Sequence, residues 1–326
     1  MVSAEESKAS PSRQILRVQV PASSANIGPG FDVLGMALSL YAHLEVDVSS
    51  PRGADSPAQS GRVDEFHPAM VAFRAAGGRG SLRVQSAIPS GRGLGFSGAV
   101  RVGGACLGLA EAEGVGASEL SNFIAERHQT ILDLSGELEG HSDNVAASLY
   151  GGVTAVFSDE RDKLLAIGVP LSPRLISECM VAVWVPSFQT STAKSRQTLS
   201  PTIDRADAVF NIAHAIRLTI AFSGLESSSR PRSELDITGL RSTFGDRLHQ
   251  EPRLEAVPLS RKALGMMINA GAITGWLSGS GPTVAALCRT TQLRDIEVAL
   301  DADDELRENG RLLKLSIDEN GLQAAR

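Results

Sequence analysis

A glycine-rich segment, IPSGRGLGFSGA at residues 88–99, carries the clearest chemical signal in the sequence. Its alternate glycines, Gly91, Gly93 and Gly95, allow a sharp turn and a close approach of the backbone to a ligand. A following helix would add unpaired N–H groups and a positive dipole end. The segment therefore predicts a phosphate cradle, with Ser97 near phosphate or metal. A structural corner with Ser97 as helix N-cap explains the same residues equally well. No lysine follows the last glycine, so this is not a P-loop.

A second polar cluster, EGHSDN at residues 139–144, precedes a stretch of small residues. It places Glu139, His141, Asp143 and Asn144 within six positions. Two carboxylates, an imidazole and an amide at this density favour a metal and substrate site over a solvated turn. The simpler alternative is that Ser142 or Asp143 caps the helix that follows.

Two further segments are interrupted by glycines in the same way. PASSANIGPGFD, at 21–32, offers Asn26 as donor and acceptor and Asp32 as an acceptor for an ammonium group. An Asx-type turn also explains this segment. LSGSGPT, at 277–283, predicts a tight backbone turn between two strands. Neither segment alone distinguishes a binding loop from a structural turn.

Apolar patterns indicate the elements that must position these segments. We expect strands at 15–20, 81–88, 151–157, 179–185, 273–278, 283–288 and 311–316. Helical spacing indicates helices at 68–75, 97–112, 119–134, 205–222, from about 259, and at 292–306. Polar loops are expected at 49–65 and 187–201. Because strands and helices mix without a strict βαβ repeat, the predicted fold class is α+β in two layers.

Length and composition fit two domains that share a cleft. The chain has 326 residues, and we place a disordered tail at 1–14 and domains at 15–172 and 173–326. A net charge of −6 argues against a nucleic-acid-binding protein. No apolar run approaches the roughly 20 residues of a membrane span, and no signal core is present, so we expect a cytoplasmic protein. Cys106, Cys179 and Cys288 are expected to be buried thiols.

In their order and content, the four segments resemble the homoserine kinases of the GHMP kinase superfamily. PASSANIGPGFD resembles the first motif, PSGRGLGFSGA the phosphate loop, EGHSDNVAASLYGG the H-x-D-N-V-A signature and LSGSGPT the C-terminal glycine loop. The resemblance runs from residue 21 to about 288. It implies an N-terminal ribosomal-protein-like α+β domain that binds ATP and a C-terminal ferredoxin-like α+β domain. It also implies ATP and Mg²⁺ as cofactors, and phosphorylation of L-homoserine to O-phospho-L-homoserine in threonine biosynthesis.

The resemblance also implies roles for individual residues. It assigns contacts with ATP to Pro89, Gly91, Arg92, Gly93, Leu94, Gly95, Ser97 and Gly98. It assigns contacts with L-homoserine to Asn26, Asp32, His141, Arg196 and Arg253, with both arginines facing the carboxylate. The implied catalytic residues are Asp32, Asn144 and Thr192, and either Asp32 or Asp143 could accept the hydroxyl proton. Ser97 and Glu139 are the candidate Mg²⁺ ligands, with Asp133 as the alternative to Glu139.

Three positions depart from the family pattern, and one of them is Gly98, where alanine is frequent. Phe96 stands where a second serine is usual, and His67-Pro68 stands where many relatives have an asparagine near the adenine. We expect the Phe96 ring to pack against Leu94 or Val100 and the adenine contacts to differ. Two alternative functions stay open: a GHMP kinase for another hydroxyl compound, of shikimate or mevalonate type, and a non-catalytic ligand sensor. A homodimer also stays open.

Overall fold

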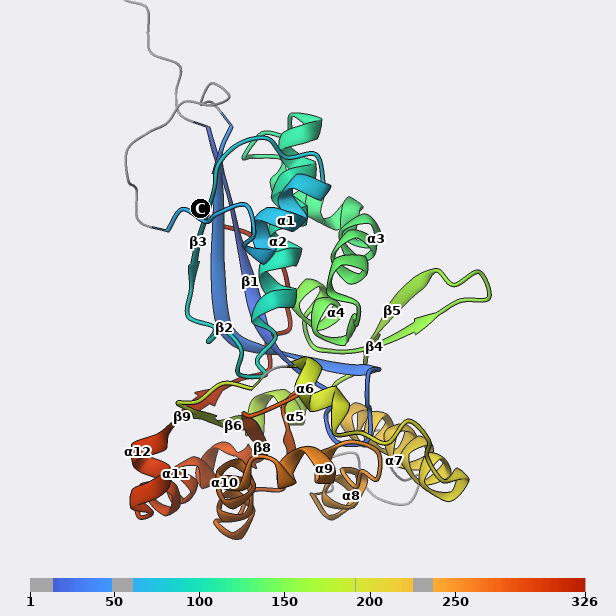
Figure 1. The fold of residues 1–326 in the computed structure, drawn as a ribbon, viewed down its shortest axis with the longest axis vertical. Coiled ribbons are helices and arrows are strands. Elements are labelled where there is room, and N and C mark those ends of the chain that lie inside the picture. Colours follow the sequence, from blue (N-terminus) through green and yellow to red (C-terminus); the bar gives the residue numbers. More distant parts are fainter. Residues whose placement is uncertain (1–13, 49–60, 191, 225–236, 326) are drawn as a thin grey trace, which may run out of the picture.

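The computed structural model describes residues 14–48, 61–190, 192–224 and 237–325. They form two α+β layers, one above the other in Figure 1, each a sheet with helices packed on it. The predicted α+β class is confirmed. Most of the predicted tail at 1–14 and of the predicted loop at 49–65 lies outside the described residues. No helix of the described chain is long and apolar enough to cross a membrane.

The upper domain is built on a six-stranded sheet whose strand pairs are antiparallel. The order is β10-β1-β2-β4-β5, and β3 pairs with β2 as well. β1 continues beyond the predicted strand through a bulge at Pro21 and Ala22. The strands are β1 (Ile15–Ala25), β2 (Leu34–Asp47), β3 (Leu82–Ser86), β4 (Val153–Ser158), β5 (Leu164–Val169) and β10 (Gln323–Ala324).

Four helices cover one face of this sheet (Figure 1). They are α1 (Pro68–Ala75), α2 (Phe96–Glu113), α3 (Leu120–Glu139) and α4 (Asp143–Tyr150). α1 begins with a proline after His67, whose side chain accepts a hydrogen bond from the Ala69 N–H. The small residues of α2 permit close packing, because a Cβ on Gly104 would lie 2.1 Å from the Ala69 carbonyl oxygen.

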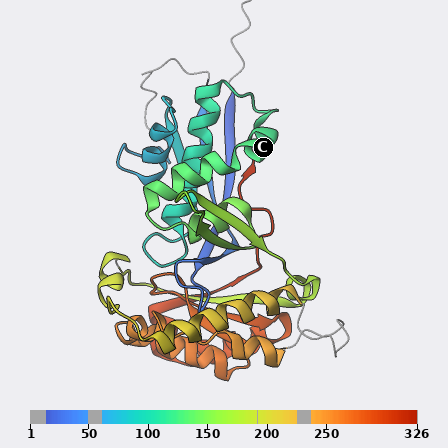
Figure 2. The same ribbon diagram turned by 90° about the vertical axis from the view of Figure 1, so that its right-hand side faces the viewer.

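The lower domain contains a four-stranded antiparallel sheet of order β7-β8-β6-β9. Helices lie between β6 and β7 and between β8 and β9, which gives the ferredoxin-like topology expected for this domain. Figure 2 shows α7 lying across this domain. The strands are β6 (Cys179–Pro186), β7 (Thr274–Leu277), β8 (Val284–Arg289) and β9 (Gly310–Leu315). The helices are α5 (Pro173–Glu178), α6 (Thr192–Gln197), α7 (Arg205–Ser223), α8 (Ile237–Thr243), α9 (Gln250–Glu255), α10 (Pro258–Asn269), α11 (Leu293–Asp301) and α12 (Asp304–Asn309), with a 3₁₀ turn at Thr290–Gln292.

Strand β6 is buried on both faces, which explains its nearly continuous apolar sequence. Val181 and Val183 point into the hydrophobic core that also contains β1, β2 and the upper helices. Ala182 and Trp184 point to the opposite face, into a second core with α10 and α11. The lower sheet therefore closes the core of the upper domain from below.

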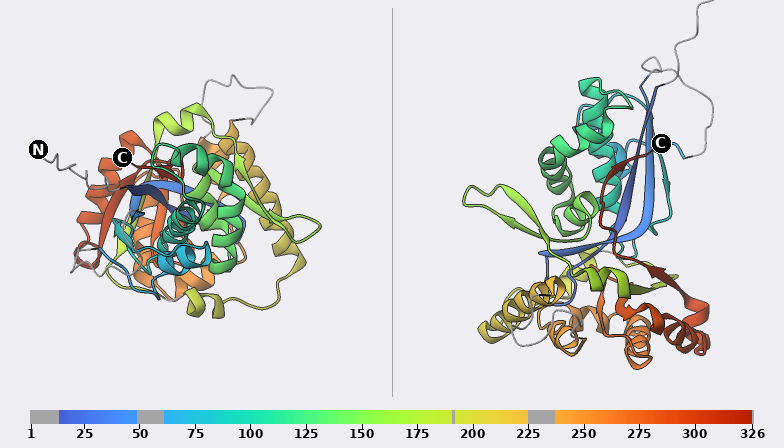
Figure 3. Two further views of the ribbon diagram at one scale, coloured as in Figure 1. Left: turned by 90° about the horizontal axis from the view of Figure 1, so that it is seen from above. Right: turned by 180° about the vertical axis from the view of Figure 1, so that it is seen from behind.

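Several features differ from the sequence prediction, which also lacked strands β2 and β5 and the short helices α5, α8 and α9. The predicted polar loop at 187–201 contains helix α6. The predicted helix at 292–306 is two helices, and Asp303 begins the second by accepting a hydrogen bond from the Leu306 N–H. After β9 the chain returns to the upper sheet, where β10 pairs with β1 (Figure 3). The residues predicted as one domain at 173–326 thus end in the sheet of the other domain. The three cysteines are buried and free.

Candidate active site

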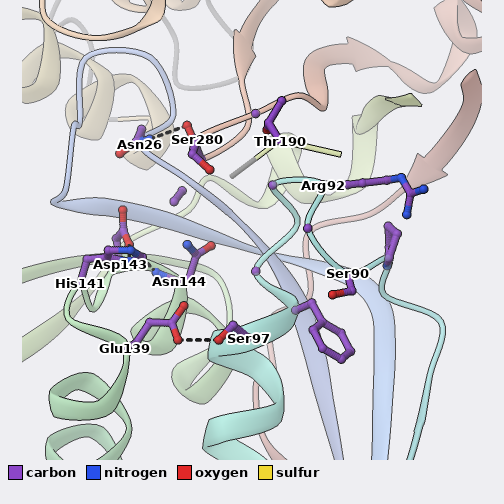
Figure 4. A pocket seen from close by; sticks show the side chains of 18 of the residues that line it. Asn26, Ser90, Arg92, Ser97, Glu139, His141, Asp143, Asn144, Thr190 and Ser280 are labelled. Atoms are coloured by element: carbon purple, nitrogen blue, oxygen red, sulfur yellow. Dashed lines mark hydrogen bonds and ion pairs between the residues drawn. The ribbon is translucent and has the colours of Figure 1, made fainter. Parts of the chain in front are cut away.

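A cavity of about 510 Å³ lies where the glycine-rich segments of the two domains meet. Figure 4 shows side chains converging on it from the β1–β2 loop, the start of α2, the α3–α4 connection and the turn after β7. Most of the predicted site residues line it: Asn26, Asp32, Pro89, Gly91, Arg92, Gly93, Gly95, Ser97, Glu139, His141, Asn144, Arg196 and Arg253.

Two predicted residues do not line the cavity, and the side chain of a third, Thr192, is not described. The Leu94 side chain is fully buried in the hydrophobic core. Gly98 faces the neighbouring helix, where an added Cβ would lie 3.3 Å from the Asn144 Cβ. Thr192 is the first residue of α6, and its side chain falls outside the described part of the structure.

The glycine-rich loop has its carbonyl groups occupied and its N–H groups available. Each carbonyl oxygen of residues 90–94 accepts a hydrogen bond, in order from Gln189, Thr190, Thr283, Ser278 and Ser23. Within the described chain, no hydrogen bond engages the N–H groups of residues 90–98. Because the carbonyl oxygens are held from outside, the N–H groups at the start of α2 are left to bind an anion.

Two loop glycines are required by packing as well as by conformation. Gly93 and Gly95 have φ angles of +79° and +66°, in the left-handed region that glycine favours. A Cβ on Gly93 would lie 2.4 Å from the Ser278 carbonyl oxygen of the lower domain. A Cβ on Gly95 would lie 2.0 Å from Ser23 Oγ of the upper domain. Both domains therefore shape this loop, and a side chain at either position would displace it.

Arg92 lines the cavity but directs its guanidinium elsewhere, away from the acidic residues in Figure 4. Its Nε donates to the Pro186 carbonyl oxygen at 2.9 Å and its Nη2 to that of Ser187 at 2.7 Å. The side chain thus attaches the loop to the end of β6. The structure assigns it a structural contact with the lower domain.

Glu139 reaches the cavity at the end of α3, opposite Ser97 (Figure 4). The Ser97 hydroxyl donates to Glu139 Oε2 at 2.7 Å, and Arg101 Nε donates to the same oxygen at 2.7 Å. Glu139 Oε1 has no hydrogen-bond partner among the described residues. The alternative carboxylate, Asp133, does not line the cavity and accepts a hydrogen bond from Gln129.

The oxygen atoms of Ser97 and Glu139 fit a magnesium ion that arrives with a nucleotide. The described residues contain no group of three or more His, Cys, Asp or Glu side chains that could hold a metal ion by themselves. Mg²⁺ commonly takes one or two protein oxygens and completes its shell with phosphate oxygens and water. A carboxylate and a hydroxyl beside an anion-binding loop supply that kind of partial shell.

Asp143 is a buried carboxyl group in the cavity wall, only 2% exposed. Burial raises the pKa of Asp143 from 3.8 to about 6, Asp32 adds to the rise, and His141 and Arg196 oppose it. Asp143 Oδ1 accepts a hydrogen bond from the Asn144 N–H at 2.8 Å and lies 3.9 Å from His141 Nδ1. A carboxyl group that titrates near 6 can accept a proton at neutral pH.

The hydrogen bonds of Asn144 show which of its polar groups faces a ligand. Its Oδ1 accepts a hydrogen bond from the Ser23 hydroxyl at 2.9 Å, and Ser148 donates to Ser23 at 3.2 Å. With its oxygen engaged, Asn144 is left with its NH₂ group for the cavity. This group fits a donor to a phosphate oxygen.

The β1–β2 loop is held in an unusual backbone conformation. Asn26, Ile27 and Asp32 have φ angles of 71°, 43° and 56°, a region that a β-branched residue rarely adopts. Asn26 Oδ1 accepts a hydrogen bond from the Asp32 N–H, and its Nδ2 donates to the Gly279 carbonyl oxygen, both at 2.9 Å. Asn26 therefore links this loop to the turn of the lower domain and presents the Asp32 carboxylate.

Two arginines surround the Phe31 ring beside Asp32. Arg196 Nη2 donates to Asp32 Oδ1 at 2.7 Å. The guanidinium carbons of Arg196 and Arg253 lie 5.8 and 5.2 Å from the centre of the Phe31 ring. Arg253 is 4% exposed, and its Nε has no hydrogen-bond partner among the described residues. A buried donor without a partner is unfavourable, so an anionic ligand group would satisfy it.

Sequence reasoning missed the residues that hold Arg253. His249 Nε2 lies 2.8 Å from the Gly28 carbonyl oxygen and must donate there, so His249 Nδ1 can accept from Arg253 Nη1 at 3.3 Å. Asp246 accepts the N–H groups of residues 248–250 and fixes the start of α9. The i, i+4 spacing of His249 and Arg253 is the sequence signal that links them.

Thr190 is a further site residue that the sequence did not reveal. Its hydroxyl is buried without a partner in the described structure, and the residue lines the cavity. Its backbone N–H donates to the Gly91 carbonyl oxygen at 3.4 Å. Thr190 thus joins the phosphate loop to the segment that leads into α6.

Phe96 packs partly against the hydrophobic core that contains Leu94 and Val100. Its ring also lies edge-on to the His67 ring, with centroids 5.9 Å apart, and both residues line the cavity. Together with Pro68 and Pro89 they form the least polar part of the wall. This part of the cavity suits a flat, weakly polar group.

Comparison with known proteins agrees with these observations. The family described as GHMP kinases C terminal matches residues 235–305. The chain is 33% identical over 334 residues to the homoserine kinase of Desulfitobacterium hafniense, covering 94% of this chain and 99% of that protein. It is 35% identical over 294 residues to the homoserine kinase of Moorella thermoacetica, covering 84% of this chain and 88% of that protein.

Solved structures of kinases share the fold. A homoserine kinase from Cytophaga hutchinsonii superposes with a TM-score of 0.73 at 20% identity, covering 98% of this chain and all of that one. The mevalonate kinase of Methanococcus jannaschii superposes with a TM-score of 0.58 at 13% identity, covering 95% and 99% of the two chains. At these identities the likeness shows the fold alone, which kinases with different substrates share.

Proposed function

The chain belongs to the homoserine kinase family, and on this premise we propose that it transfers the γ-phosphoryl group of ATP to the side-chain hydroxyl of L-homoserine. The observation that carries the proposal is the meeting of two binding features in one cavity. The available N–H groups of residues 90–98 suit a polyphosphate. The buried and incompletely bonded Arg253 suits a carboxylate.

The charged residues support a zwitterionic substrate. In the present structure Arg196 and Asp32 neutralise each other across 2.7 Å. An amino acid can replace this ion pair, because its carboxylate takes the arginines and its ammonium group takes Asp32. Every charge then keeps a partner, which a buried site requires. The side-chain hydroxyl would extend toward Asp143 and Asn144.

Asp143 is the better of the two candidates for accepting the hydroxyl proton. Asp32 is engaged with Arg196 and its side chain is 36% exposed, whereas Asp143 is buried and has a raised pKa of about 6. In the proposed reaction the hydroxyl oxygen bonds to the γ-phosphorus, and the bond from that phosphorus to the β–γ bridging oxygen breaks. ADP leaves, and the hydroxyl proton passes to Asp143. A weak base suffices because phosphoryl transfer depends mainly on alignment and charge stabilisation.

We also propose that Glu139 Oε1 and Ser97 Oγ hold Mg²⁺. The ion, when bound with ATP, would neutralise negative charge on the β- and γ-phosphates. The loop N–H groups and the Asn144 amide would donate hydrogen bonds to the same phosphates. We propose a role for Thr192 in the same step, because the family resemblance implies that this residue lies near the transferred phosphate.

A substrate panel tests the proposal directly. Purified protein with ATP and Mg²⁺ is supplied with L-homoserine, mevalonate or shikimate, and ADP release is measured together with the phosphorus NMR spectrum of the product. We expect turnover with L-homoserine alone and a phosphate ester at its side-chain oxygen. Faster turnover of another hydroxyl compound would reassign the substrate. Nucleotide binding without turnover of any compound would instead support a ligand sensor.

A further inference from the structure

Arg101 forms an ion pair with Glu139 from outside the cavity. It lies one turn after Ser97 on α2, so the two side chains share one face of the helix. Arg101 itself does not line the cavity. The Arg101 and Glu139 side chains are only 17% and 11% exposed, and the bond from Nε to Oε2 is 2.7 Å long. Ser97 and Arg101 therefore hold the same carboxylate oxygen from two directions.

The position of Glu139 explains why its carboxylate requires such support. It is the last residue of α3, and Gly140 ends the helix in a left-handed conformation. The negative end of the helix dipole disfavours a carboxylate there. A glutamate side chain also has several rotamers, and fixing one of them opposes its conformational entropy. Two donors on Oε2 fix the rotamer and leave Oε1 toward the cavity.

We propose that Arg101 is a positioning residue for the magnesium site, and that it presents Glu139 Oε1 to the ion. The inference rests on the proposed function, because Mg²⁺ is part of that proposal. With Oε2 engaged, Glu139 can offer the ion one oxygen, which suits the small number of protein ligands that Mg²⁺ takes. Loss of a side chain that is hydrogen-bonded to a metal ligand typically lowers metal affinity 10- to 100-fold.

Two effects of removing Arg101 oppose each other. Loss of a positive charge near the ion would by itself tighten metal binding. Loss of the fixed carboxylate orientation would weaken it. The proposal states that orientation dominates, because Arg101 is attached to the ligand carboxylate itself and this pair is largely buried. Weaker metal binding after removal of Arg101 would therefore indicate positioning, and tighter binding would indicate charge compensation.

Binding of Mn²⁺ to the protein–ADP complex, followed by electron paramagnetic resonance, measures metal affinity without turnover. We expect Arg101→Gln to weaken Mn²⁺ binding about 10- to 100-fold and Arg101→Lys, which keeps the charge and one donor, to weaken it less. Homoserine binding, measured by calorimetry, should stay unchanged. The matched control is Arg127→Gln, because Arg127 pairs with Glu113 at 2.7 Å across the same two helices, on an exposed surface.

The outcomes separate this inference from the proposed function. Unchanged or tighter Mn²⁺ binding in Arg101→Gln, or an equal loss in Arg127→Gln, would overturn the positioning role. If Arg101→Gln does not fold, Arg101→Met, which also lacks the charge and the donor, decides on the same criterion. Glu139→Gln provides the separate test: if it leaves Mn²⁺ binding unchanged, the proposed metal site itself is wrong. Weakened binding in Glu139→Gln without a change in Arg101→Gln would reject the inference alone.

Discussion

Replacing Asp143 by asparagine should abolish activity while making the protein more stable. The substitution keeps the shape of the side chain and an Oδ1 that can accept the Asn144 N–H. It removes a carboxyl group whose pKa is raised by burial from 3.8 to about 6, because ionisation is unfavourable in the folded protein. In the unfolded chain this group ionises near 3.8, so folding between these values takes up a proton.

The sign and size of the effect follow from proton linkage. Because the folded state binds more protons, the contribution of Asp143 to stability falls as pH rises from about 4 to about 6 and then levels off. The rise in pKa from 3.8 to about 6 corresponds to about 3 kcal/mol at pH 8. At pH 5 the same linkage gives roughly half of that amount.

Denaturant unfolding of the wild-type protein and of Asp143→Asn at pH 5 and pH 8 measures this difference. We expect the variant to be more stable at both values, with the larger gain at pH 8, and to lose turnover. Wild-type kcat should fall as pH drops below about 6, as Asp143 takes up a proton. For stability alone, Asp32→Asn serves as the control, since the Asp32 side chain is 36% exposed and paired with Arg196. An Asp143→Asn variant that is no more stable at pH 8, or that keeps normal kcat, would refute the reasoning.

The remaining predictions concern the other walls of the cavity. Arg253→Ala should weaken homoserine binding by about 2–5 kcal/mol, and Arg196→Ala should weaken it by less, because Arg196 is more exposed. Calorimetry measures the binding of homoserine and of ATP separately. Equal losses for both ligands would contradict the carboxylate role. Phe96→Ser should leave kcat within about tenfold of wild type, which is about 1.4 kcal/mol in barrier height, whereas Ser97→Ala should lower kcat by more. Steady-state kinetics measures both changes. A wild-type protein that is inactive until Phe96 is replaced would contradict the enzyme assignment. Thr190→Val should raise the KM of one substrate about fivefold without lowering Tm, because the loss of one hydrogen bond costs about 1 kcal/mol. An unchanged KM would mean that the hydroxyl contacts no ligand.

The parts of the site that depend on local chemistry could be predicted from the sequence. The glycine spacing at 91, 93 and 95 dictates a left-handed turn before a helix, and the structure has that turn. The polar cluster at 139–144 likewise ends one helix and begins the next at the cavity. In both segments the local sequence indicates the turn, although contacts with both domains also hold the glycine-rich loop in place.

Features that depend on distant parts of the chain could not be predicted in this way. The pKa of Asp143 is raised by burial, and burial is a property of the assembled tertiary structure. The contact of Arg101 with Glu139 joins two helices, and Arg101 reads in sequence as an ordinary polar position on α2. Strand β2 was missed because its glycine and small residues weaken the alternation, while pairing with three neighbouring strands stabilises it. The return of β10 to the upper sheet has no local signal either.

The chain crosses between the two domains twice, and both crossings join the lower sheet at neighbouring strands, β6 and β9. β6 begins at Cys179 and β9 ends at Leu315, and Val181 pairs directly with Leu315. Neighbouring strands lie about 5 Å apart, so these crossings alone would form a narrow hinge. The β1–β2 loop adds a third attachment, because the Gly28 carbonyl oxygen binds His249 in the lower domain.

Hinge motion requires a free axis of rotation between two domains. Two domains that are attached at three places lack such an axis. We therefore expect a smaller segment, and not a whole domain, to move when substrates enter and leave. The described part of the segment at 187–201 carries Arg196 and attaches to the rest of the site through side-chain and backbone hydrogen bonds. We expect crystal structures with and without homoserine to differ in the position of Arg196, while the angle between the two sheets stays the same.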